Sequence, residues 1–271
     1  MSGELNQLEL ATGLIGGLAL FLFGMDIMTR ALKQVAGASL KTILARMTSN
    51  RFTGMVAGAS VTAIIQSSSI TTVLLVGFVS AGLMTTAQSV AVILGANIGT
   101  TITAQILAFK VTALALPVLS VGFFVSFIAK EKETQEYGRI LLGLGMVFFG
   151  MVIMSDAMKP LRSHQPFLDF MVSLDSVFLA ALAGAGFPAL VQSSSATTGI
   201  LIVMAGQGLI ALEPAVALAL GANIGTCVTA LLASIGKPHQ AVRTAMVHTF
   251  FNVAGVLIWV GFVDELAALA R

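Results

Sequence analysis

The amino-acid sequence predicts an all-α polytopic membrane protein made of two inverted repeats, each with a re-entrant hairpin and a broken helix. Of its 271 residues, 57% are hydrophobic and only 10% are charged, and the mean hydropathy is +0.98. A soluble domain of this length carries about 25% charged residues, because it needs a polar surface. The apolar residues form long runs, and about 20 apolar residues in succession cross a bilayer core. Two motifs also occur twice at one spacing, which indicates a duplication.

The duplication rests on motifs that share one offset. Gln-Ser-Ser-Ser at 66–69 returns at 192–195, and Gly-Ala-Asn-Ile-Gly-Thr at 95–100 returns at 221–226, so 192 − 66 and 221 − 95 both equal 126. A constant offset without insertions indicates two homologous halves. We assign residues 1–130 to repeat 1 and residues 131–271 to repeat 2. The charged stretch Lys130–Glu136 between them is expected to be a solvated loop.

Each half is predicted to contain the same elements in the same order. A long apolar helix (9–33 and 137–159) precedes a polar connection (38–50 and 161–174). The two flanks of the first Gln-Ser-Ser-Ser, 52–65 and 70–83, have 14 residues each. As helices they measure about 21 Å, less than the roughly 30 Å of a bilayer core, so we expect a hairpin that enters and returns. An apolar segment interrupted by Gly-Ala-Asn-Ile-Gly-Thr (86–109 and 212–235) and a final helix (111–129 and 240–262) complete each half.

The charged residues predict the orientation of the chain. The acidic N-terminus (Glu4, Glu9) argues against a cleavable signal, so we expect the first apolar run to be a permanent helix. With the N-terminus outside and the halves inverted, ten basic residues lie inside and four lie outside, namely Lys110, Lys159, Arg162 and Arg271. This split follows the positive-inside tendency. We expect a multi-pass protein of the inner (cell) membrane.

The repeated Gln-Ser-Ser-Ser favours an anion site. Irregular polar backbone is tolerated in a membrane only where it lines a buried cavity. The serines can cap the helix after each motif, whose free N–H groups and positive dipole end attract anions, and the glutamine amide can donate to an oxyanion. Two copies in inverted halves are expected to face each other near the midplane. The candidate anion ligands are Gln66, Ser67, Ser68, Ser69, Gln192, Ser193, Ser194 and Ser195.

Gly-Ala-Asn-Ile-Gly-Thr favours a cation site. Its glycines permit a helix break that frees carbonyl oxygens, and hard cations such as Na+ prefer oxygen ligands. The acid that we place within the membrane, Asp26, is either a sodium ligand or an ion-pair partner of Arg30. The candidate sodium ligands are Asn97, Thr100, Thr101, Asn223, Thr226 and Asp26.

Two further considerations bear on these sites. No lysine or arginine lies near either motif along the chain, so sodium ions are expected to compensate the charge of a buried anion. Serine and glycine in membrane helices can also serve close helix packing alone. Duplication in register, beside a glutamine and a glycine motif, favours the ligand site over that alternative.

Other kinds of chemistry are disfavoured. The single cysteine, Cys227, excludes an internal disulfide and is too little for a metal site, so we predict no metal beyond sodium and no cofactor. No nucleophile–base pair stands out, which argues against an enzyme. The basic residues lie in short loops between apolar runs and give no sign of nucleic-acid binding. His248 and Asn252, at i and i+4 of the last helix, are expected to form interhelical hydrogen bonds.

The paired motifs carry a family resemblance. Two Gln-Ser-Ser-Ser motifs, each followed by Gly-Ala-Asn-Ile-Gly-Thr, resemble the type II sodium–phosphate cotransporter family over nearly the whole chain. The segment Arg243–Asn252 is also similar to the family segment that follows the second motif. The resemblance implies that phosphate and sodium bind between the repeats, at both Gln-Ser-Ser-Ser regions with Asn97, Thr100, Asn223 and Thr226 close by.

Two departures from the family pattern matter. Cys227 replaces the threonine found at 101 in the first repeat, so the half-sites need not bind equally. Many bacterial members carry a soluble helical C-terminal domain, whereas this sequence ends at Arg271, which implies a short member or a shortened form.

The functional hypothesis is secondary active transport of inorganic phosphate, coupled to sodium, by alternating access in the lipid bilayer. The alternatives are a transporter of another oxyanion, such as sulfate, and a membrane phosphate sensor or scaffold without translocation. The sequence leaves a homodimer open, together with the direction of net transport.

Overall fold

The structure of the chain, a computed structural model, describes residues 7–36, 50–108, 114–167 and 176–270, and in these ranges it contains helices and no strands. The first half provides α1 (Gln7–Ala36), α3 (Arg51–Ile65), α4 (Ser68–Ser80), α5 (Thr86–Ala108) and α6 (Ala115–Ile128). The second half provides α7 (Lys132–Met158) with a 3-10 turn (Lys159–Ser163), α9 (Val177–Val191), α10 (Ser194–Gly206), α11 (Leu212–Gly225), α12 (Cys227–Ser234), α13 (His239–Trp259) with a 3-10 turn (Val260–Phe262), and α14 (Val263–Ala270). The first predicted polar connection, 38–50, lies outside the described residues except for Asn50, and the second, 161–174, is described as far as residue 167, beginning within the 3-10 turn Lys159–Ser163.

The long apolar helices confirm an all-α polytopic membrane protein. Within the described part of the chain, five helical segments are long and apolar enough to cross a bilayer: Gln7–Ala36, Thr86–Ala108, Lys132–Ser163, Leu212–Ser234 and His239–Ala270. The helices around the two Gln-Ser-Ser-Ser motifs are shorter. α3 has 15 residues and α4 has 13, so each spans about 20 Å. These lengths agree with the predicted hairpin, whose depth in a membrane stays a prediction.

The sequence analysis predicted a solvated loop for the charged stretch between the halves, and this prediction is wrong. Lys130 is the last residue before a bend at Glu131, and α7 begins at Lys132. Glu133 lies in the first turn of this helix, where a carboxylate is favoured by the positive end of the helix dipole. Local helix electrostatics therefore extend α7 by five residues beyond the apolar segment that predicted it.

The predicted helix break is found in one half only. α5 runs without interruption through Gly95–Thr100, whereas the equivalent segment changes from α11 to α12 at Thr226. The glycines serve close packing instead. A Cβ added at Gly95 would lie 1.9 Å from the Met55 carbonyl oxygen of α3. One added at Gly221 would lie 1.9 Å from the Ala181 carbonyl oxygen of α9, so the same backbone contact recurs 126 residues later.

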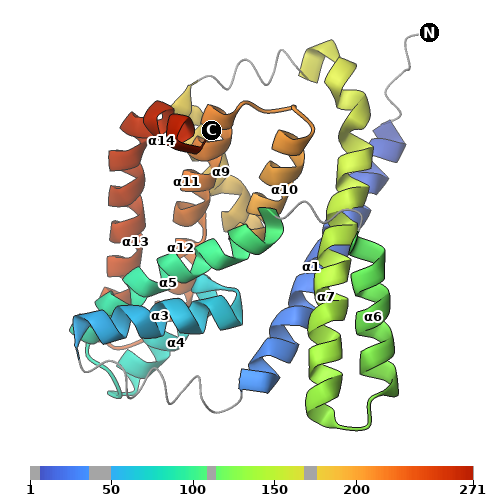
Figure 1. The fold of residues 1–271 in the computed structure, drawn as a ribbon. Coiled ribbons are helices and arrows are strands. Elements are labelled where there is room, and N and C mark those ends of the chain that lie inside the picture. The colour runs from blue at the N-terminus through green and yellow to red at the C-terminus, as the bar shows by residue number, and fades with distance from the viewer. Residues whose placement is uncertain (1–6, 37–49, 109–113, 168–175, 271) are drawn as a thin grey trace.

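The first helices of the two halves pack antiparallel. α1 and α7 lie side by side along most of their lengths (Figure 1). A Cβ at Gly17 would lie 2.8 Å from the Gly150 oxygen, and one at Gly24 would lie 2.6 Å from the Gly143 oxygen. Gly143 and Gly150 follow Gly17 and Gly24 by 126 residues, so equivalent positions meet across this contact. The inversion of the whole halves relative to a bilayer stays a prediction.

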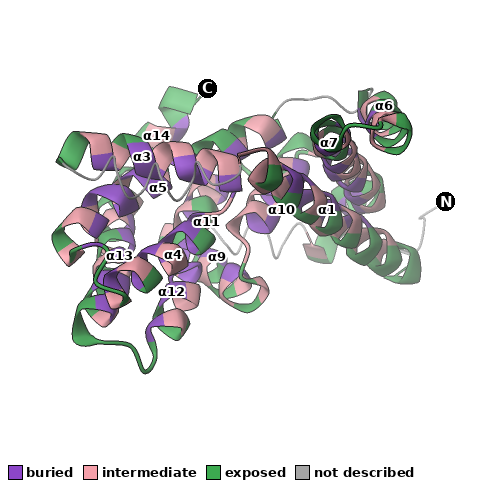
Figure 2. Cartoon of the chain, turned by 90° about the horizontal axis from the view of Figure 1, so that it is seen from below, coloured by how far each residue is buried: buried purple, intermediate pink, exposed green. Residues whose placement is uncertain are grey.

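The hydrophobic cores mix residues of both halves. One cluster joins Val61, Leu75 and Val92 of α3, α4 and α5 to Ala230 and Ala245 of α12 and α13. A second joins α1 to α7 and α10 around the fully buried ring of Phe21. By contrast, α6 packs mainly on α7, and apart from Ala115 and Gly122 its residues are exposed or half-buried (Figure 2). The cores thus join the first motif hairpin to α12 and α13, and α10 of the second motif hairpin to α1 and α7.

Candidate functional site

Both motif glutamines occupy a strained backbone conformation. Gln66 ends α3 with φ 58° and ψ 24°, and Gln192 ends α9 with φ 56° and ψ 29°. Among the described residues they are the only non-glycine residues with positive φ. A non-glycine residue in the left-handed region costs about 1–3 kcal/mol and persists where the surroundings require it, often at ligand sites. The left-handed conformation of each glutamine ends one helix, and the next helix begins two residues later, at Ser68 and Ser194.

A serine caps each of these new helices. The Ser67 hydroxyl accepts a hydrogen bond from the Ile70 N–H at 3.3 Å, and the Ser193 hydroxyl accepts one from the Ala196 N–H at 3.2 Å. The other N–H groups of the first turn have no partner within the helix. Together with the positive end of the helix dipole, they form an anion-binding end. The chain therefore contains two such ends, at α4 and α10.

The two helix ends meet at one cavity. It has a volume of about 310 Å³, within the range of small-molecule sites, roughly 300–1,000 Å³. Seven of the eight candidate anion ligands line it, and Ser68 does not. Gln66 is 5% exposed, its amide nitrogen donates to the Ala63 carbonyl, and its Oε1 is buried without a hydrogen-bond partner. An unpartnered buried polar atom at the edge of a cavity is ready to interact with a ligand.

Helix α1 forms a further wall of this cavity and contributes charge. Asp26, Arg30 and Lys33 all line it, which gives two cations and one carboxylate, a net charge of +1. Arg30 and Asp26 form an ion pair with Nη2–Oδ2 at 2.7 Å and a hydrogen bond with Nε–Oδ1 at 3.0 Å. Of the two alternatives for Asp26, the structure contains the ion pair with Arg30; its role as a sodium ligand stays a prediction, and Asp26 also lines the cavity.

The sequence analysis inferred that no basic residue lies near the motifs, and in the folded chain this inference is wrong. Arg30 and Lys33 are more than thirty residues from either motif along the chain. The packing of α1 and α10 around Phe21 nevertheless brings them to the same cavity. An anion here would face positive side chains as well as helix dipoles. Sodium is thus not the sole source of charge compensation.

The candidate sodium ligands divide into two groups. Asp26 and Thr100 line the cavity. The rest lie elsewhere: the Asn97 amide donates to Asn252 Oδ1 of α13 at 3.4 Å, and the hydroxyls of Thr101 and Thr226 donate to backbone carbonyls. The Asn223 side chain is exposed. The contact between Asn97 and Asn252 is an interhelical hydrogen bond of the kind expected for the last helix.

The sequence analysis missed the contribution of α1 to the site. Leu22, Asp26, Thr29 and Lys33 follow the spacing i, i+4, i+7 and i+11, so they share one face of this helix. A polar stripe on one face of an apolar helix is a signal that could have found them. The sequence analysis named Asp26 as a candidate sodium ligand and Arg30 as its possible partner, but it did not name Leu22, Thr29 or Lys33 as site residues.

Comparisons with known proteins identify the family of the chain. The family described as Na+/Pi-cotransporter matches residues 20–156 and 165–269. "Uncharacterized protein YqeW" of Bacillus subtilis is 33% identical over 255 residues, which cover 91% of this chain and 83% of that protein. No solved structure matches the chain.

Two further relatives carry functional names. "Putative inorganic phosphate export protein YjbB" of Escherichia coli is 31% identical over 255 residues, covering 94% of this chain and 47% of that protein, so the chain spans about half the length of that relative. "Sodium-dependent phosphate transport protein 2C" of mouse is 49% identical over 88 residues, which cover 31% of this chain and 15% of that protein.

Proposed function

Because this chain belongs to the Na+/Pi-cotransporter family, which is a family of transporters and not of enzymes, we propose that it carries inorganic phosphate across the inner membrane with Na+ as the coupling ion. One observation carries the proposal to the residue level. The serine-capped ends of α4 and α10 line the same cavity as Arg30 and Lys33. Two helix dipoles and two cations suit a small oxyanion.

Phosphate would bind between the two helix ends in this proposal. The hydroxyls of Ser69, Ser194 and Ser195 and the free N–H groups of the first turns donate to its oxygens. Arg30 gives the strongest contact, since a guanidinium can donate two parallel hydrogen bonds to one phosphate. Phosphate must compete with Asp26 for Arg30, and the carboxylate that it displaces is then available to Na+.

Sodium coupling has a physical basis in this exchange. Once released, Asp26 is a carboxylate without its cation beside a bound anion, and both charges repel each other. A Na+ ion held by Asp26 and the Thr100 hydroxyl removes that repulsion, so each ion strengthens the binding of the other. In an alternating-access cycle the cavity would open to one side and then to the other, as the halves move against each other.

A second function, phosphate export without sodium coupling, is supported by two observations. The Escherichia coli relative is named for export. In addition, the side chains of Arg30 and Lys33 provide positive charge in the cavity without a bound sodium ion.

Flux measurements in proteoliposomes separate these functions. With purified protein at equal ionic strength, coupled transport predicts phosphate uptake that follows an imposed sodium gradient and stops when choline replaces sodium. Equal flux in both salts supports sodium-independent phosphate movement. Binding without flux would identify a sensor, and sulfate that competes as well as arsenate would identify a less selective oxyanion transporter.

A further inference from the structure

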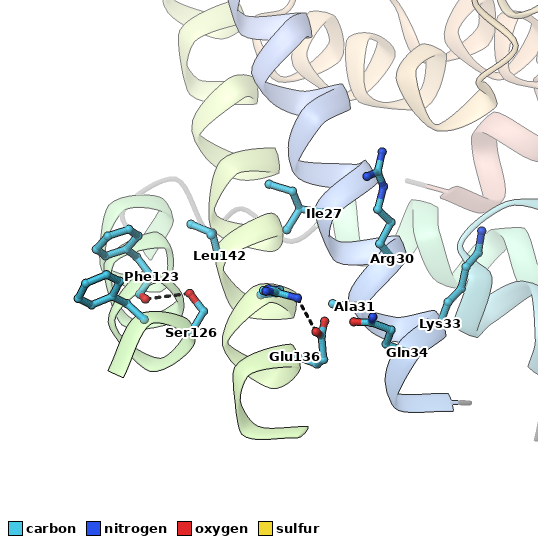
Figure 3. A pocket seen from close by; sticks show the side chains of 11 residues that line it. Ile27, Arg30, Ala31, Lys33, Gln34, Phe123, Ser126, Glu136 and Leu142 are labelled. Carbon is cyan, nitrogen blue, oxygen red and sulfur yellow. Dashed lines mark hydrogen bonds and ion pairs between the residues drawn. The ribbon is translucent and has the colours of Figure 1, made fainter. Parts of the chain in front are cut away.

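A groove between α1, α6 and α7 has the composition of a lipid site. Its volume is about 660 Å³, and it crosses the face of α7 between the other two helices (Figure 3). Ile27 and Leu142 lie toward one end of it, while Gln34 and Glu136 lie toward the other (Figure 3). The polar end is where α1 ends and α7 begins. Apart from Arg30, which lies level with Ile27 (Figure 3), the lining changes from apolar to polar along the helix axes, in the direction in which a lipid chain meets its headgroup.

Aromatic side chains form the apolar wall. Phe123 and Phe127 of α6 are stacked with their ring centroids 5.8 Å apart, and they are 46% and 75% exposed. α6 packs mainly against α7, and both rings remain exposed among the described residues. In a membrane protein such a surface contacts acyl chains. A free phosphate ion would gain nothing from this half of the groove.

The groove as a whole carries a net positive charge. Arg30, Lys33 and Arg139 line it with one carboxylate, Glu136, which gives 3 − 1 = +2. Glu136 is buried and paired with Arg139 at 2.5 Å. A second hollow of about 600 Å³ shares Gln34, Glu136 and Arg139 with the groove and adds Lys132 and Glu133, so its own charges balance and the positive charge lies in the groove itself. Basic pockets between transmembrane helices suit anionic headgroups.

We propose that this groove binds an anionic phospholipid, with its phosphate at Arg139 and Lys33 and an acyl chain along Phe123 and Phe127. The proposal does not depend on which ion the protein transports. It uses residues on the opposite side of α1 and α7 from the serine motifs, apart from Arg30 and Lys33, which line both the groove and the cavity.

The test is native mass spectrometry of the full chain in detergent, titrated with dioleoyl phosphatidylglycerol or dioleoyl phosphatidylcholine. We expect phosphatidylglycerol to be retained in preference. The double variant Glu136→Gln/Arg139→Gln keeps the net charge but removes the cation at the headgroup. It should bind phosphatidylglycerol about fivefold more weakly, the loss typical of one basic residue near an anionic lipid.

A matched pair of phenylalanines tests the apolar wall. Phe127→Ala should weaken binding of phosphatidylglycerol, and Phe250→Ala should not, because Phe250 is 74% exposed on α13 but lies outside the groove. Both positions are exposed, so both variants should fold. Equal retention of the two lipids, or variants that bind like the wild type, would overturn the proposal.

Two further results would also overturn it. Displacement of the lipid by millimolar inorganic phosphate would make the groove a site for the free ion. A dimer that disappears in Phe127→Ala would make it an interface between two copies of the chain.

Discussion

Substitutions at Asp26 and Arg30 should change phosphate affinity in opposite directions. Asp26 holds the Arg30 guanidinium through contacts of 2.7 and 3.0 Å, and bound phosphate must displace it. The two side chains are 46% and 77% exposed, so the pair is worth only about 0.2–1 kcal/mol. Removing the competing carboxylate in Asp26→Asn should therefore tighten phosphate binding about 1.4- to 5-fold when choline replaces sodium.

Arg30→Gln should have the reverse effect. A hydrogen bond to a charged group contributes about 1.5–3 kcal/mol, equivalent to roughly 10- to 150-fold in affinity. Because the Arg30 side chain is exposed to solvent, we expect the lower end of this range, which is about 10-fold weaker phosphate binding. Asp26→Asn should in addition reduce the stimulation of phosphate binding by sodium, because the proposed cation ligand is lost.

Equilibrium binding of radiolabelled phosphate to the purified protein, in sodium and in choline chloride, measures both effects. Asp156→Asn is the matched control. Asp156 forms an ion pair with Lys159 at 2.7 Å on α7, is similarly exposed, and lies outside the cavity, so its loss should leave phosphate affinity unchanged. If Arg30→Gln binds phosphate as the Asp156 variant does, or if Asp26→Asn weakens binding in choline, the assignment of this cavity is wrong.

Three further predictions concern the serines, the helix packing and the coupling ion. Ser69→Ala should weaken phosphate binding about 10-fold or more, whereas Ser68→Ala, equally buried but outside the cavity, should not; equal effects in a binding titration would point to packing alone. Gly95→Ala should lower the melting temperature in detergent, since overpacking costs about 1–3 kcal/mol or more, whereas Gly77→Ala, with nothing within 4 Å, should not. Sodium should raise phosphate affinity at least about fivefold, and equal affinities in sodium and choline would remove the cation from the site.

Much of the fold follows from composition and repetition. The apolar runs predict the helices, and the offset of 126 residues predicts that α9 and α10 repeat α3 and α4, whose bounds differ by that number. The predicted break is found only between α11 and α12, although the motif glycines of both α5 and α11 let a neighbouring helix approach. A sequence cannot distinguish a glycine that permits a helix break from one that permits close packing. The start of α7 was missed because a charged stretch suits a first helical turn as well as a loop.

The seven residues of the two motifs that line the cavity could be predicted from the sequence as candidate anion ligands, because Gln-Ser-Ser-Ser interrupts apolar segments, where polar groups need a partner. The presence of Arg30 and Lys33 beside them could not be predicted, because it depends on how α1 packs. The sequence by itself determined that this chain is a duplicated membrane protein with two serine-capped helix ends. Only the tertiary structure decided that the ends share one cavity and which charges face it, because side chains remote in sequence become neighbours only when their helices pack around common cores.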